Sequence, residues 1–178
     1  RSYYSKYKFD VIDVGGERNY PIDSVYLDKP AKDYITSGTD IINKIIVDDR
    51  EEYTDILFFV TSVNETFDYC KKNISDDDYC VEVYSDMMEN KKQFAQDKDE
   101  YKTTGKSKKI VVATNVAESS LTIDGIKYVI DSGLELYNYY DPKLHSDVLV
   151  KKYITKAQVK QRMGRAGRTK PGICYHLY

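Results

Sequence analysis

Three side chains near the end of the chain have the types and the spacing to act on a phosphate group. Gln161, Arg165 and Arg168 stand at positions i, i+4 and i+7, which predicts that they share one stripe of an α-helix. Guanidinium groups stabilise the charge that develops when a nucleoside triphosphate transfers its γ-phosphoryl group to water, and an amide can orient the attacking water. The alternative is a structural role in which Arg165 and Arg168 form ion pairs.

The segment around these residues is predicted to be a rigid element rather than a flexible basic tail. Thr155 and Gln158 have the spacing of a capping box, so we expect a helix that begins at Lys156. Gly164 and Gly167 weaken a helix by about 1 kcal/mol each relative to alanine. Because glycine lets a neighbouring backbone or a ligand approach closely, they fit a segment that presents its arginines at short range.

Basic residues are concentrated in the same segment. Residues 151–170 hold eight Lys and Arg and no acidic residue, whereas the whole chain has 27 basic residues, 29 acidic residues and a net charge of −2. The rest of the chain therefore has 19 basic against 29 acidic residues, a charge of −10. Positive charge focused in this way predicts a local anionic ligand. A solvated basic face is the alternative.

Composition limits the class of protein. A chain of 178 residues, 41% hydrophobic and 31% charged, fits one soluble globular domain with its own core. No apolar run approaches the ~18 residues of a membrane span, and the first residues lack the apolar core of a signal peptide. Cys70, Cys80 and Cys174 are too few and too scattered for a disulfide framework or a four-ligand zinc site. We therefore expect an intracellular protein, cytoplasmic or nuclear and not secreted, or one of the host cell or virion if it is viral. We expect no metal site and no membrane partner.

Apolar runs and helical patterns alternate along the chain, which predicts an α/β fold with a mostly parallel sheet. The apolar runs expected to form strands are 55–60, 79–84, 109–114, 126–133 and 172–178, after two shorter ones at 9–14 and 24–27. The helices are expected at 31–49, 64–72 and 86–95, with a further helix from residue 156.

Small polar side chains follow three of these strands where each strand ends. They are Thr61 and Ser62, then Ser85, then Thr114 and Asn115. Hydroxyl and amide groups, together with the first backbone N–H groups of the next helix, suit the phosphate oxygens of an extended polyanion. The alternative is that these residues only cap the helices that follow.

Several of these segments resemble one family. "QRMGRAGR" (161–168) is similar to motif VI of superfamily 2 helicases, and "ATNVAESSLTIDGIKYVIDSG" (113–133) is similar to motif V of the DEAH/DExH RNA helicases. "ILFFVTS" (56–62), "VYS" (83–85) and "YYDPKL" (139–144) resemble motif IV, motif IVa and the hook-turn segment. The resemblance implies a RecA-like second domain with helices on both faces of the sheet. RNA would cross its strand ends, and ATP would bind in a cleft that faces the first RecA-like domain.

The resemblance assigns roles to individual residues. Arg165 and Arg168 would be arginine fingers, and Gln161 would position the attacking water. The residues expected at the nucleotide are Asp124, Phe94 and Arg162. The residues expected at the RNA backbone are Thr61, Ser62, Ser85, Thr114, Asn115, Ser119, Thr122 and Lys143. Lys143 replaces the usual hook-turn arginine. Its side chain would keep the positive charge but could not form the two parallel hydrogen bonds that arginine makes to a phosphate. A β-hairpin is expected at about 134–154.

The chain has no GxxxxGK[ST] phosphate loop and no Asp-Glu-x-His motif. The resemblance therefore implies that 1–178 is a single helicase C-terminal domain, a fragment of a longer helicase, and inactive alone. The first RecA-like domain of the same protein would supply the phosphate loop and the Mg²⁺ that accompanies ATP. The implied partners are single-stranded RNA and that first domain, and the resemblance also allows activating proteins.

Two other functions stay open. One is a catalytically inactive helicase-like module that only binds RNA or protein. The other is a DNA helicase domain, because backbone contacts discriminate poorly without a group that reads the 2′-OH.

Overall fold

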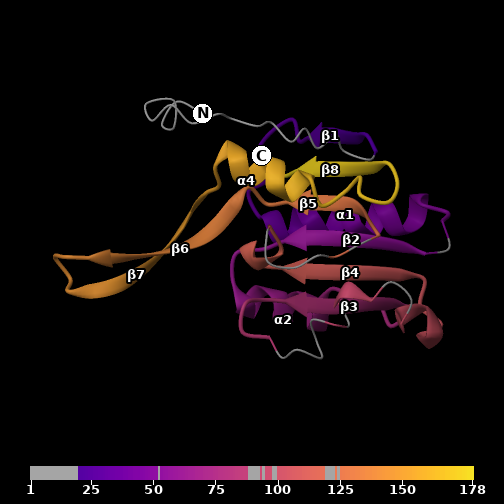
Figure 1. The fold of residues 1–178 in the computed structure, drawn as a ribbon, viewed down its shortest axis with the longest axis horizontal. Coiled ribbons are helices and arrows are strands. Elements are labelled where there is room, and N and C mark those ends of the chain that lie inside the picture. Colours follow the sequence, from indigo (N-terminus) through magenta and orange to yellow (C-terminus); the bar gives the residue numbers. More distant parts are fainter. Residues whose placement is uncertain are drawn as a thin grey trace, which may run out of the picture.

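A six-stranded sheet, with every pairing parallel, forms the centre of the molecule (Figure 1). The computed structural model describes residues 20–178 except 52, 88–92, 94, 98–99, 119–122 and 124. The strands are β1 (Ile22–Tyr26), β2 (Thr54–Phe59), β3 (Asp78–Val83), β4 (Lys108–Ala113), β5 (Ile126–Asp131) and β8 (Gly172–His176), in the spatial order β1-β8-β5-β2-β4-β3. The helices are α1 (Tyr34–Asp48), α2 (Val63–Lys72) and α4 (Lys156–Met163), with 3-10 helices η2 (Glu100–Thr104) and η3 (Asn115–Glu118).

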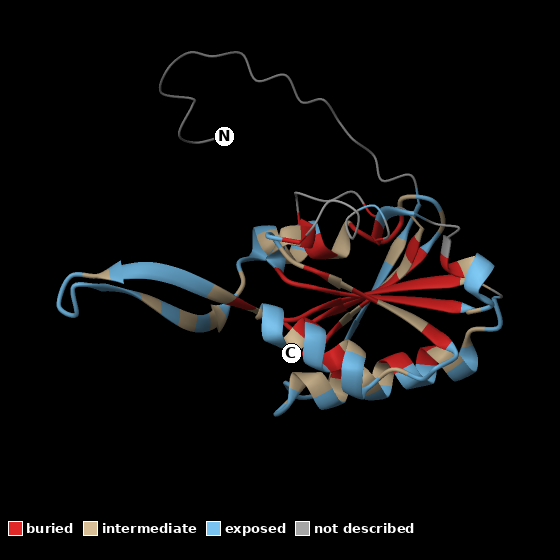
Figure 2. Ribbon diagram, turned by 90° about the horizontal axis from the view of Figure 1, so that it is seen from below, coloured by how far each residue is buried: buried red, intermediate tan, exposed pale blue. Residues whose placement is uncertain are grey.

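Each face of the sheet has its own apolar core, because successive side chains of a strand point to opposite faces. Ile56 and Phe58 of β2 pack with α1 and α2, whereas Leu57 and Phe59 pack on the other face with η3 and the end of α4. All six residues of β2 are buried, as expected for a strand covered on both sides. Figure 2 shows the buried strands between helical segments. The predicted α/β fold, a mostly parallel sheet with helices on both faces, is confirmed.

Local signals explain where the helices of one face begin and how closely they pack. Asp33 accepts a hydrogen bond from the backbone N–H of Ile35 (3.0 Å) and so caps α1. Within α1, a Cβ on Gly38 would lie 2.4 Å from Cζ of Phe58. Only glycine therefore lets this helix lie so close to β2.

Strands β6 (Leu134–Asp141) and β7 (Ser146–Tyr153) form a separate antiparallel hairpin. It projects from the carboxyl end of β5, away from the sheet (Figure 1). The hairpin expected at about 134–154 is confirmed.

Two of the three cysteines form a disulfide, which the sequence did not predict. Cys70 of α2 is bonded to Cys80 of β3, with the Cα atoms 5.5 Å apart. The spacing of ten residues along the chain gave no sign that the helix returns against this strand. The cysteine count therefore carries no argument about the redox compartment. Among the residues that the structure describes, no helix has the length and apolarity needed to cross a bilayer.

Candidate functional site

The polar side chains that follow three strands lie at one edge of the sheet. Strands β2, β4 and β3 are neighbours in that order, and their carboxyl ends are in register. The backbone joins these ends directly, because the N–H of Thr114 donates to the carbonyl of Val83 (3.0 Å). Ser85 and Asn115 are exposed there. The structure thus brings together the residues expected to form one polar row.

At the end of β2, a carboxylate of the same domain already binds the donor groups of the polar row. One oxygen of Glu65 accepts from the N–H of Thr61 (2.8 Å), the hydroxyl of Thr61 (2.7 Å) and the N–H of Ser62 (3.0 Å). Burial raises the pKa of Glu65, but hydrogen bonds from Tyr34, Thr61 and Lys151 outweigh it and lower the pKa to about 2. Ser62 in turn caps α2.

The helix-capping alternative is therefore confirmed for Ser62. Glu65 did not figure among the expected site residues, although the Ser-x-x-Glu spacing of a capping box was a signal for it. Its carboxylate holds the donors of Thr61 and Ser62 that were expected to meet RNA.

Helix α4 begins as predicted. The hydroxyl of Thr155 accepts from the N–H of Gln158 (3.3 Å), and the side chain of Gln158 accepts from the N–H of Thr155 (2.9 Å). Lys156 is the first helical residue.

The expected single helical stripe is wrong, because α4 ends at Met163. Gly164 caps it, and the chain then turns through Gly167, whose φ is +70°. A Cβ on Gly167 would lie 2.6 Å from Cγ1 of Ile22, so the turn packs directly against β1. Arg165 and Arg168 therefore sit on a turn beyond the helix that carries Gln161.

The two arginines of the turn still lie close together. Arg165 is 6% exposed and donates from Nη2 to the main-chain carbonyl of Glu118. Burial lowers the pKa of Arg165, the positive charge of Arg168 lowers it further, and the negative charge of Glu118 opposes both. Arg168 is half-buried and Gln161 is exposed. Because arginine stays protonated despite such a shift, the turn concentrates two positive charges.

Arg162 lies in the interior. It is fully buried, and its guanidinium donates to the carboxylates of Glu118 (2.8 Å) and Asp131 (2.8 Å) and to the carbonyl of Leu134 (3.1 Å). Its guanidinium carbon also lies 4.7 Å from the ring centroid of Phe59. This placement corrects the expectation that Arg162 contacts the nucleotide, because its guanidinium is enclosed by the domain itself.

Asp131, the last residue of β5, is the second acid that the sequence reasoning missed. It accepts from the N–H of Gly133 (2.9 Å), Arg162 (2.8 Å) and the hydroxyl of Tyr178 (2.9 Å). Burial raises the pKa of Asp131, but the hydrogen bond from His176 and the charge of Arg162 outweigh it, so the pKa is lowered. An acidic residue at the end of an otherwise apolar strand was the only signal for it.

Lys143, another expected site residue, is not at the strand ends. Lys143 lies in the turn at the tip of the hairpin, where its N–H donates to Asp141 (2.8 Å). The eight residues of β6, at about 3.3 Å each, place this tip about 26 Å from the sheet. Asp124, Phe94, Ser119 and Thr122 lie outside the described residues. Within the described ranges, no group of three His, Cys, Asp or Glu side chains could hold a metal ion.

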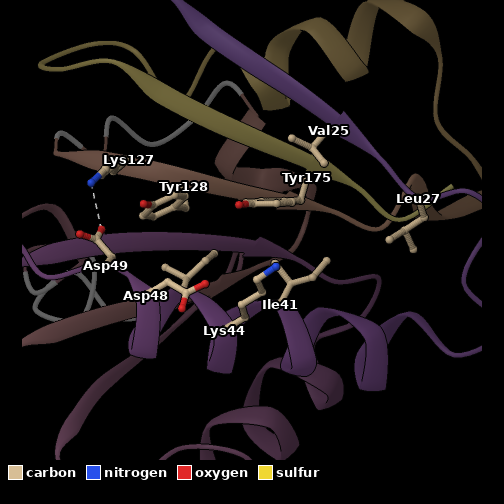
Figure 3. A pocket seen from close by; sticks show the side chains of 10 residues that line it. Val25, Leu27, Ile41, Lys44, Asp48, Asp49, Lys127, Tyr128 and Tyr175 are labelled. Atoms are coloured by element: carbon tan, nitrogen blue, oxygen red, sulfur yellow. Dashed lines mark hydrogen bonds and ion pairs between the residues drawn. The ribbon is translucent and has the colours of Figure 1, made fainter.

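Two hollows in the described part of the chain are lined neither by the polar row nor by the arginines. A pocket of about 490 Å³ lies between α1 and strands β1, β5 and β8, on the face opposite Arg165. Figure 3 shows its apolar floor with Tyr128 and Tyr175, and the ion pair between Lys127 and Asp49 (3.0 Å) at one end. A smaller hollow of about 270 Å³ lies between Gly125 and the segment Thr169–Lys170.

Comparison with known proteins gives consistent matches. The family described as helicase conserved C-terminal domain matches residues 38–170. A protein of Acanthamoeba polyphaga mimivirus, named as an ATP-dependent RNA helicase, is 46% identical over 180 residues, which are 99% of this chain and 26% of that protein. The pre-mRNA-splicing factor ATP-dependent RNA helicase prp22 of Schizosaccharomyces pombe is 37% identical over 97% of this chain and 15% of its own length.

Solved structures agree with these relatives. The Escherichia coli DExH-box NTPase HrpB superposes with a TM-score of 0.74 and 30% identity over 90% of this chain and 19% of that one. A second structure of HrpB, described as a DEAH/RHA helicase, gives a TM-score of 0.73 and 28% identity over 90% of this chain and 20% of that one. The chain thus spans about a quarter or less of the length of each of these proteins.

Proposed function

Because the chain belongs to the helicase conserved C-terminal domain family, we propose that it is the second RecA-like motor domain of an ATP-dependent RNA helicase. One observation of the structure carries this proposal beyond the family match. The turn after α4 carries Arg165 and Arg168 three residues apart, and it fixes Arg165 in a buried position with its guanidinium bound to the carbonyl of Glu118. Such a turn suits the phosphates of a nucleotide bound by a neighbouring domain.

In this proposal the turn acts as the electrostatic half of an ATPase site. Arg165 and Arg168 stabilise the charge on the transferring γ-phosphoryl group, and Gln161 orients the attacking water. Asp124 and Phe94 contact the ribose and the adenine. The chain has no GxxxxGK[ST] and no Asp-Glu-x-His motif, so in this proposal the first RecA-like domain supplies both the phosphate loop and the ligands of Mg²⁺. When bound, Mg²⁺ neutralises charge on the β- and γ-phosphates.

The strand ends act as the RNA-binding half. Ser85, Thr114 and Asn115 contact the backbone of a single strand from neighbouring strands of the sheet. The proposal also includes Ser119 and Thr122 among the residues that contact RNA. Thr61 and Ser62 reach a phosphate only after Glu65 releases their donors, and Lys143 binds RNA that extends to the hairpin tip.

ATP binding closes the two RecA-like domains on each other, and hydrolysis reopens them. Because RNA lies across the strand ends, each cycle shifts this domain along the strand and drives unwinding. An intracellular location and regulation by activating proteins belong to the same proposal.

RNA-stimulated ATP hydrolysis by the full-length protein tests the proposal. Arg165→Ala is expected to lower kcat by about 10³- to 10⁵-fold, because a γ-phosphate arginine contributes that much. Lys160→Ala is the matched control, since Lys160 is an exposed basic residue of α4 with no assigned role. A wild-type protein that binds RNA and hydrolyses no ATP would instead identify the inactive binding module. Equal stimulation by single-stranded DNA would favour the DNA helicase.

A further inference from the structure

Arg162 and Arg165 are joined through one residue. Glu118, the last residue of η3, accepts from Nε of Arg162 through its carboxylate (2.8 Å). Its main-chain carbonyl accepts from Nη2 of Arg165. The position of Arg165 therefore depends on where Arg162 holds Glu118.

Arg162 is itself fixed from four sides. Its side chain is 0% exposed and is bound by Glu118, by Asp131 (2.8 Å), by the carbonyl of Leu134 and by the ring of Phe59. These groups come from the end of η3, the ends of two sheet strands and the start of the hairpin. A guanidinium held in this way has one orientation, because its donors form a planar fork with fixed directions.

We propose that Arg162 and Glu118 are positioning residues that hold Arg165 in the geometry needed for γ-phosphoryl transfer. The inference rests on the proposed function of Arg165 and adds residues that do not touch the nucleotide. A long, flexible arginine side chain is effective as an electrostatic catalyst only if it is preorganised. A shift of about 1 Å at the reacting groups is enough to cost about 10²-fold in rate.

The same short helix connects this cluster to the polar row. Thr114 and Asn115 begin the segment that ends at Glu118, and the N–H of Ala117 donates to the carbonyl of Thr114 (3.2 Å). Ala117 and Glu118 are both buried, so the fold restricts the end of η3 that contacts the two arginines.

A purely structural role predicts a different outcome from a positioning role. Replacing a buried ion pair by uncharged groups of similar volume is often neutral for stability, whereas removing one partner is costly. The double variant Arg162→Met/Glu118→Gln therefore removes Arg162 together with one of its two carboxylate partners. Asp131 keeps its hydrogen bonds from Gly133 and Tyr178 in this variant but loses the charge of Arg162, so some loss of stability is expected.

The experiment measures kcat and KM for ATP, together with Tm, in the full-length protein with saturating RNA. We expect the double variant to show a kcat about 10- to 100-fold lower and a KM for ATP within about twofold of wild type. Its Tm should fall, because the buried carboxylate of Asp131 loses the charge of Arg162. Glu135→Gln is the matched control. Glu135 is also a buried carboxylate (7% exposed), but it binds Gln158 (2.5 Å) and Lys152 (3.4 Å) rather than the arginines.

A double variant with wild-type kcat overturns the inference, and so does a kcat that falls no further than in Glu135→Gln. If the double variant does not fold, the single variant Glu118→Gln tests the inference instead. Glutamine keeps the side-chain volume of Glu118 and an oxygen that can accept from Arg162. A kcat at least about fivefold lower at unchanged KM then supports the positioning role, and a kcat within about twofold refutes it. Failure of the proposed function is distinguishable, because Arg165→Ala would then leave ATP hydrolysis unchanged whatever the Glu118 variants do.

Discussion

Substitution of Gly167 by alanine should destabilise the domain through two separate effects. Gly167 lies between Arg165 and Arg168 and has a φ of +70°, a left-handed conformation that costs an L-residue about 1–2 kcal/mol. The added methyl group would also lie 2.6 Å from Cγ1 of Ile22 and 3.0 Å from the carbonyl of Tyr20. Overpacking of this kind costs about 1–3 kcal/mol. The two effects together predict a loss of about 2–5 kcal/mol.

Gly105 allows the two effects to be separated. Its φ is +78°, but a Cβ there would meet no atom within 4 Å. Gly105→Ala should therefore lower the free energy of unfolding only by the cost of the left-handed conformation, about 1–2 kcal/mol. Urea unfolding of the 178-residue chain, followed by circular dichroism, measures both free energies of unfolding. Ile22→Ala removes the Cγ1 atom that opposes the added methyl group, so in its background Gly167→Ala should cost less than in the wild type, whereas the cost of Gly105→Ala should not change.

Equal losses in the two glycine variants would refute the packing argument. They would mean that the turn after α4 moves away from β1 at no cost, and a turn that moves so easily could not hold two arginines in place. The matched φ values make the comparison direct, because only the surroundings of the two glycines differ.

Three further outcomes are expected. The 178-residue chain alone should hydrolyse no ATP above a blank in a phosphate-release assay, because it has no phosphate loop; turnover that Arg165→Ala abolishes would contradict this. Folded Glu65 has a pKa of about 2 against an ordinary value of 4.5, so its stabilisation is complete above about pH 4.5 and is lost as the pH falls toward 2. Glu65→Gln should remove about 1–2 kcal/mol of that acid sensitivity in urea titrations at each pH, after allowance for solvent screening. Lys143→Arg should tighten RNA binding about two- to fivefold in fluorescence anisotropy, and an unchanged Kd would show that the tip meets no phosphate.

Features encoded by short stretches of sequence were predictable. The apolar run 55–60 became the fully buried strand β2, and the Thr155–Gln158 pair began α4 at Lys156. Both signals act within a few residues, through a continuous apolar run in one case and through reciprocal capping in the other. The polar row followed from them, because the carboxyl ends of neighbouring parallel strands must share an edge.

Features that depend on distant partners were not predictable. Arg162 binds Glu118 and Asp131, which precede it by 44 and 31 residues, and nothing in the spacing distinguished it from Arg165. The end of α4 was missed for a related reason. Helical spacing applies only while the helix continues, and Gly164 and Gly167 end it where the chain must pass close to β1.

Burial, rather than charge, shows that the basic segment 151–170 is a rigid element and not a flexible tail. Arg162 is 0% exposed, Arg165 is 6% exposed and Arg168 is half-buried, so the three guanidiniums run from the interior to the surface. A fully exposed arginine would bind anions with little selectivity, because water screens its charge and its side chain samples many rotamers. A fully buried one could bind none. Arg165 lies between these limits, since the fold restricts its motion through Glu118 while its charge remains next to that of Arg168. A guanidinium that the fold holds in place beside a second positive charge should therefore bind a phosphate from a neighbouring domain more strongly than a fully exposed or a fully buried one.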